Sequence, residues 1–74
     1  MRIVFFGRLR DGAPAGAVPP GVRDTAALRA WLGRERPELL DVSIRIAVND
    51  ELILGDRPLG DEDEIAFLPP MSGG

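Results

Sequence analysis

The chain has 74 residues with no cysteine and no histidine, which excludes disulfides, thiolate ligands and an imidazole that titrates near neutral pH. Its net charge of −3 argues against nucleic-acid binding, and no apolar run approaches the ~18 residues of a membrane span. We expect a single soluble, cytoplasmic domain that is held together by apolar packing alone, with no metal site and no bound cofactor.

The first predicted element is a strand over residues 2–6, whose sequence RIVFF is β-branched and aromatic. Alternation along a strand puts Ile3 and Phe5 on one face. Val4 and Phe6 then point to the opposite face. The segment is apolar on both faces, which is typical of a buried strand.

A loop and then the one predicted helix follow this strand. Residues 7–21 are rich in Gly and Pro and predict a loop, with a short edge strand around residues 17–18. Asp24 is a good N-cap, because its carboxylate can accept from the first unpaired amides of a helix. The apolar residues at helical spacing are Leu28, Trp31 and Leu32. Pro37 cannot continue the helix, which should end just before it, and the ELL that follows adds a turn that packs one leucine on the core.

The second half of the chain predicts a hairpin and a last strand. The stretch SIRIAVND, residues 43–50, alternates cleanly and places on one face its apolar residues Ile44, Ile46 and Val48. A tight turn at its end leads into ELIL, a second short strand at residues 51–54. In the last strand, Ile65 and Phe67 point inward and Leu68 points outward, beside the end of the chain.

This order of strands around a single helix predicts an α+β domain. One helix laid across one face of a mixed sheet of about four to five strands is the β-grasp, or ubiquitin-like, arrangement. We expect the domain to span residues 1–70, with the first and last strands at the centre of the sheet.

The sequence finishes on FLPPMSGG, and this stretch is the main indication of function. Pro69 and Pro70 cannot donate to a sheet ladder, and they favour a stiff, extended segment. Glycine has no Cβ, so a terminal diglycine fits a narrow channel and lets a carboxylate reach a buried site. We therefore interpret residues 71–74 as a flexible substrate tail; a frayed terminus without function is the alternative.

Three stretches of the sequence resemble the ubiquitin-like sulfur carriers, and most closely the small subunits of molybdopterin synthases. They are VFFGRLRD at residues 4–11, AVND at residues 47–50 and PLGDEDEIAFLPPMSGG at residues 58–74. The last stretch is the most specific, because it combines an acidic turn, a strand and a Pro-Pro-x-x-Gly-Gly terminus. The resemblance covers the whole chain, although residues 8–21 match poorly.

The resemblance implies a co-substrate whose catalytic groups lie on its partners, and not an enzyme. An adenylyltransferase and sulfurylase related to ubiquitin-activating enzymes would use ATP to adenylate the carboxylate of Gly74, and a sulfur donor would leave a thiocarboxylate there. The tail, with Met71, Ser72 and Gly73, would enter the large subunit of the synthase and deliver sulfur to a pyranopterin precursor of the molybdenum cofactor. The residues expected to bind these partners are Leu68, Pro69, Pro70, Leu52 and Phe6.

Three other functions stay open on the sequence. A sulfur carrier could serve another acceptor, in thiamine thiazole synthesis, cysteine synthesis or tRNA thiolation. The chain could be a ubiquitin-like modifier joined to other proteins through Gly74, although the absence of lysine excludes self-chains through side-chain isopeptide bonds. It could also be a plain interaction domain with an inert tail.

Overall fold

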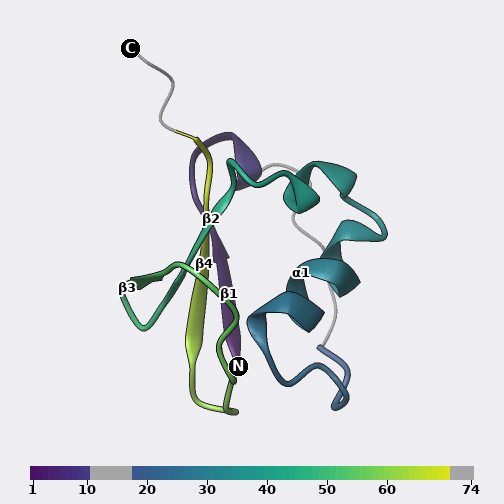
Figure 1. The fold of residues 1–74 in the computed structure, drawn as a ribbon, viewed down its shortest axis with the longest axis vertical. Helices are drawn as coiled ribbons and strands as arrows, with labels where there is room; N and C mark the ends of the chain where they lie inside the picture. The colour runs from purple at the N-terminus through teal and green to yellow at the C-terminus, as the bar shows by residue number, and fades with distance from the viewer. Residues whose placement is uncertain (11–17, 71–74) are drawn as a thin grey trace.

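The computed structural model of the chain describes residues 1–10 and 18–70. Predictions for the other residues, the edge-strand residue Ala17 and the tail included, lie outside this described part. Within it one α-helix and two short 3₁₀ helices (η) accompany a sheet (Figure 1). The elements are β1 (Arg2–Phe5), η1 (Gly7–Arg10), α1 (Thr25–Gly33), η2 (Pro37–Leu40), β2 (Arg45–Val48), β3 (Glu51–Ile53) and β4 (Glu64–Leu68). No helix in these ranges is both long and apolar enough to cross a membrane.

The strands form one four-stranded mixed sheet in the order β1-β4-β2-β3. β1 runs parallel to β4, while β2 is antiparallel to both β3 and β4. With α1 on one face, this confirms the predicted α+β, β-grasp arrangement. β4 is interior as expected, but β1 lies at the edge of the described sheet and not at its centre. Apolar residues along a strand describe its two faces; they do not specify hydrogen bonding at both of its edges.

The predicted hairpin joins β2 to β3 through two residues. Val48 pairs with Glu51, so Asn49 and Asp50 form the whole turn. Their φ angles are 50° and 69°, the left-handed region that a type I′ turn requires at both central positions. Asn and Asp enter that region more readily than other non-glycine residues, so the turn chemistry favours this register.

The start of α1 is capped as the sequence predicts. The Asp24 carboxylate accepts a hydrogen bond from the Ala27 amide at 2.7 Å, which satisfies one of the unpaired amides of the first turn. The helix ends at Gly33, earlier than the expected end before Pro37. A Cβ at Gly33 would lie 2.5 Å from Leu40 Cδ2, so Leu40 packs where only a glycine leaves room and the chain turns away into η2.

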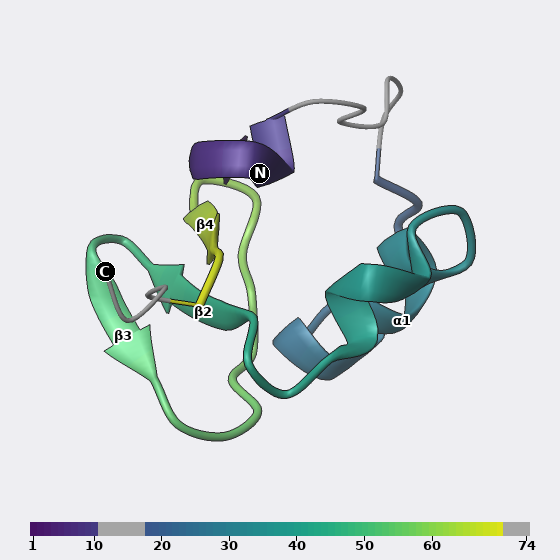
Figure 2. The same cartoon turned by 90° about the horizontal axis from the view of Figure 1, so that it is seen from above.

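The core lies between α1 and the inner face of the sheet, the face that α1 lies over in Figure 2. The predicted inward positions are confirmed: Ile65 and Phe67 are fully buried. Of the two leucines in η2, Leu39 is fully buried and Leu40 is 51% exposed. The buried cluster consists of Leu9, Leu28, Leu32, Leu39, Ile44, Ile46, Val48, Ile65 and Phe67. Trp31 is half-buried at the margin of this cluster.

The segment after β1 contains a core residue that the sequence did not indicate. Residues 7–10 form η1 inside the predicted loop, and Leu9 within it is only 2% exposed. A single leucine between arginines has no apolar periodicity, so no pattern distinguished it from a loop residue. Val18 is half-buried against the core and belongs to no strand.

One carboxylate joins the segment after β3 to the start of α1. Asp56 accepts hydrogen bonds from the Thr25 hydroxyl at 2.8 Å and from the amides of Ala26 and Arg57 at 2.9 Å. These hydrogen bonds, the one from the Ala26 amide first, lower the pKa of the Asp56 carboxyl below its ordinary value. Thr25 is buried, and its hydroxyl accepts from the Arg57 amide at 3.0 Å, so the ionised carboxylate fixes how this segment meets the helix.

We expect Asp56→Asn to lower the free energy of unfolding at neutral pH. The variant should also lose less of this free energy than the wild type does as the pH falls. Because the folded-state pKa of Asp56 is lowered, the carboxylate stabilises the fold above its unfolded-state pKa of about 3.9. This contribution is lost as the pH falls through the lower folded-state value. Urea denaturation at neutral pH and at several values below about pH 4 measures the effect. The control is Glu62→Gln in the exposed acidic turn; equal acid profiles for the two variants would contradict the assignment.

Candidate functional site

The structure describes the root of the predicted tail, which we define as Leu68, Pro69 and Pro70, and all three are half-buried. Met71, Ser72, Gly73 and Gly74 lie outside the described residues. The Phe6 amide donates to the Phe67 carbonyl at 3.1 Å, which continues the β1–β4 pairing beyond the last residue of β1. The turn η1 lies at this same end of β4 (Figure 1). At Gly7, where φ is +57°, a Cβ would lie 3.0 Å from Pro69 Cγ, so η1 packs directly on the tail root.

An aromatic pair and an arginine hold the end of β4 from the core side. The rings of Phe5 and Phe67 stack with centroids 5.4 Å apart. The Arg36 guanidinium lies over the Phe5 ring at 5.6 Å and donates to the Leu9 carbonyl at 2.8 Å and to Glu38 at 2.9 Å. Its side chain is only 12% exposed. Arg36 therefore ties η2 to β1 and η1 just below the tail root. The sequence pattern did not indicate these contacts of Arg36, because an arginine before Pro37 is expected at the end of a helix.

The sheet face away from α1 carries an apolar row. Register pairs Val4 with Ala66, Ala66 with Ala47, and Ala47 with Leu52, so these four side chains lie side by side across all four strands. In the next row toward the tail root, Leu68 pairs with Arg45. We call the residues of these two rows the outer face: Val4, Ala47, Leu52, Ala66, Leu68 and Arg45. Figure 2 shows that α1 covers only the opposite face.

Three residues predicted to bind partners are found on or beside the outer face. Leu52 is 50% exposed, and Phe6, directly after β1, is 47% exposed. Leu68 points to the outer face as predicted but is half-buried and not fully exposed. The reason is its place on β4, an interior strand whose two neighbours cover its flanks. The register thus brings Leu52 and Leu68 onto one surface that ends at the tail root.

The acidic turn lies at the far end of β4 from the tail root and has a structural role. The Asp63 carboxylate accepts from the Gly60 amide at 2.7 Å and from Asn49 Nδ2 at 2.9 Å. These hydrogen bonds, led by that of the Gly60 amide, lower the pKa of Asp63. The Asn49 side chain in turn accepts from the Glu64 amide at 2.9 Å. Among the described residues, no group of three or more acidic side chains could hold a metal ion.

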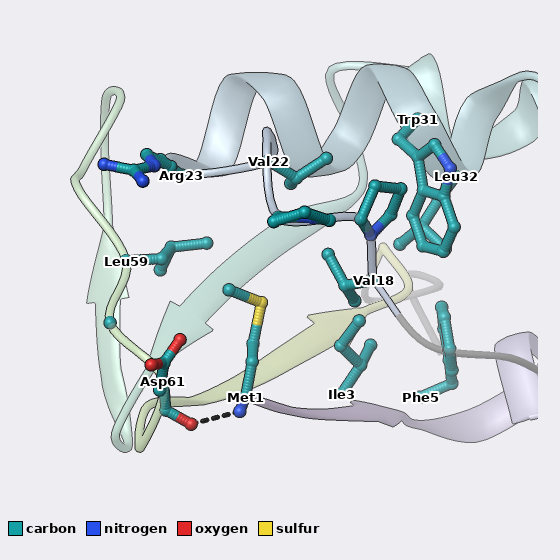
Figure 3. A pocket seen from close by; sticks show the side chains of 13 residues that line it. Met1, Ile3, Phe5, Val18, Val22, Arg23, Trp31, Leu32, Leu59 and Asp61 are labelled. Atoms are coloured by element: carbon teal, nitrogen blue, oxygen red, sulfur yellow. Dashed lines mark hydrogen bonds between the residues drawn. The ribbon is translucent and has the colours of Figure 1, made fainter.

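A hollow of about 800 Å³ lies on the helix side between β1 and α1 (Figure 3). Ile3 and Phe5 form its floor and Trp31 and Leu32 its roof. Most of its walls are side chains that also border the core. The Met1 amine donates to the Asp61 carbonyl at its rim. The hollow continues the core margin and lies away from the outer face, so we assign it no chemistry.

Comparison with known proteins identifies close similarity over the whole chain. A family model described as the ThiS family matches residues 3–74. The chain is 34% identical over 80 residues to the molybdopterin synthase sulfur carrier subunit of Escherichia coli strain K12. That alignment covers 100% of this chain and 99% of the relative.

The two sheet faces should respond differently to substitution. We expect Phe67→Ala to lower the free energy of unfolding by about 3–5 kcal/mol, up to complete unfolding, because it opens a cavity in the core. Leu52→Ala should change it by less than about 1 kcal/mol, since this side chain is 50% exposed. Urea denaturation of both variants measures the difference. Similar losses would mean that the outer face is packed against the rest of the chain.

Proposed function

The chain belongs to the ThiS family, and from that premise we propose that it is the sulfur carrier subunit of a molybdopterin synthase. The observation that carries this proposal is the 34% identity with the Escherichia coli subunit. The alignment covers 100% of the chain and so includes the diglycine end.

In the proposed reaction sequence the Gly74 carboxylate is the reacting group. Its oxygen attacks the α-phosphate of ATP on an adenylyltransferase partner, pyrophosphate leaves, and an acyl-adenylate forms. A sulfur donor then displaces AMP from the acyl carbon, which leaves a thiocarboxylate on Gly74. In the synthase the thiocarboxylate sulfur bonds to the pyranopterin precursor, and water then cleaves the acyl–sulfur bond, so that the sulfur stays on the precursor and the Gly74 carboxylate returns. ATP is thus a substrate of the activating partner, and this chain binds no cofactor of its own.

The residues of this chain hold and present the tail, while the catalytic acids and bases belong to the partners. Two contacts support this role, because they fix the strand from which the tail starts. The Phe5 ring stacks on Phe67, and the Arg36 guanidinium lies over the Phe5 ring. Asp56 and Asp63 are kept ionised by structural hydrogen bonds, which suits neither for proton transfer near neutral pH. We propose that this cycle runs in the cytoplasm, where ATP is available to the activating partner.

The outer face is the surface proposed to meet the large subunit. It is the sheet face that α1 leaves uncovered (Figure 2). Its apolar residues range from Ala47, which is 8% exposed, to Leu52, which is 50% exposed, and an apolar sheet face without a helix over it commonly marks a protein interface. Because this face ends at Leu68, a partner seated on it would lie next to the tail root and could receive the tail directly.

Deletion of Gly74 should abolish sulfur transfer and leave the thermal midpoint of unfolding nearly unchanged. The deletion shortens the tail by one residue and so moves the terminal carboxylate to Gly73, while every residue of the buried cluster of the core is kept. Conversion of the pyranopterin precursor by the reconstituted synthase, and a thermal melt of the carrier, are the two measurements. Full transfer activity after the deletion would overturn the role of Gly74. If the deletion instead abolishes high-mass conjugates of this chain with other proteins in the native host and leaves sulfur transfer intact, the chain is a protein modifier.

Leu68→Asp should weaken binding of the large subunit by at least tenfold and lower the thermal midpoint far less than a core substitution does. A carboxylate here would be desolvated beside the apolar row of the outer face when the partner covers it. The matched control is Leu40→Asp on η2, a leucine that is 51% exposed and lies outside the outer face. Isothermal titration with the large subunit measures affinity. Equal weakening by both variants would argue against an interface at Leu68.

A further inference from the structure

An arginine stands among the apolar side chains next to the tail root. Arg45, the first residue of β2, is exposed and pairs with Leu68, the last residue of β4. A shallow hollow that Arg45 lines also includes Arg29 of α1 and the side chains of Val42 and Leu54, which are 90% and 89% exposed. Arg45 therefore lies beside exposed apolar side chains at the tail-root end of the outer face.

The charge of Arg45 is not balanced in the way that the neighbouring charges are. On the same sheet, Arg2 pairs with Glu64 at 3.6 Å, and on β3 Glu51 pairs with Arg57 at 2.8 Å. Within the described residues the remaining ion pair is that of Arg36 with Glu38, so Arg45 takes part in none of the three. In the free protein, water solvates this guanidinium.

Covering this surface changes the energetics of Arg45. A partner that buries Leu68 and its apolar neighbours also removes water from the guanidinium between them. A desolvated charge without a counter-charge is costly, whereas one with a hydrogen-bonded carboxylate is not. The chemistry of the surface therefore selects a partner that is apolar over most of the contact and acidic at one place.

We propose that the large subunit, seated on the outer face, supplies a carboxylate to Arg45 next to the tail root. The inference rests on the proposed function and adds the chemistry of the partner surface. Because Arg45 is paired with Leu68, two residues before Pro70, the ion pair forms beside the point where the tail starts. It sets the orientation in which the two proteins meet, since a rotated encounter would leave both charges buried and unpaired.

Arg45→Met tests this proposal by whether it lowers or raises the affinity for the large subunit. Methionine keeps an unbranched apolar side chain of similar length and removes the charge. If the partner presents a carboxylate, that group is left buried and unpaired, and we expect the affinity for the large subunit to fall by about tenfold or more. If the partner is apolar at this place, Arg45→Met binds as tightly as the wild type or more tightly. Isothermal titration at two salt concentrations is the measurement, and the wild-type affinity should fall more steeply with salt than that of the variant.

The matched control is Arg23→Met, an exposed arginine at the rim of the helix-side hollow, which should bind like the wild type. Arg45→Gln, with an expected loss of similar direction, replaces Arg45→Met if the methionine variant aggregates. If the wild-type carrier binds the large subunit and the Arg45 variants bind it equally well or more tightly, the proposed ion pair is wrong. The proposed function is not affected by that result. Failure of the wild-type carrier to bind the large subunit overturns the proposed function and the inference with it.

Discussion

The fold and the site both depend on the hydrogen bonding of β4 to two neighbours at once. β1 runs parallel to it on one side, and β2 runs antiparallel to it on the other. Its inward residues Ile65 and Phe67 are fully buried, so the strand cannot shift without opening the core. The same strand leads into Pro69 and Pro70. The part of the chain proposed to reach into a partner therefore starts from one of the two interior strands of the described sheet.

Each face of this strand has a separate task. The inner face packs under α1 and supplies the stability that a short chain without disulfides needs. The outer face carries an apolar row in which Leu52 is exposed and Ala47 is buried, and Arg45 lies at its tail-root end. Arg36, on the inner side, connects η2 to the aromatic pair below the tail root. Stability and recognition are thus divided between opposite faces of one small sheet.

The strongly periodic parts of the chain were predictable from the sequence, and the irregular parts were not. Alternation in residues 43–50 and the capping residue Asp24 led directly to the observed hairpin and helix start. Leu9 and Arg36 were missed because their roles arise from contacts between segments far apart in the chain, such as the hydrogen bond from Arg36 to the Leu9 carbonyl. The edge position of β1 was missed for a similar reason, since strand order depends on long-range pairing. For the tail, sequence motif and family similarity supply the argument, and its residues lie outside the described part.

The central claim is that Gly74 carries sulfur as a thiocarboxylate. The most direct measurement is the intact mass of the chain after incubation with its activating enzyme, ATP and a sulfur donor, with fragmentation to locate any change. We expect a gain in mass equal to the replacement of one oxygen by sulfur, located at Gly74. An unchanged mass, under conditions in which the same enzyme converts another carrier, would contradict it.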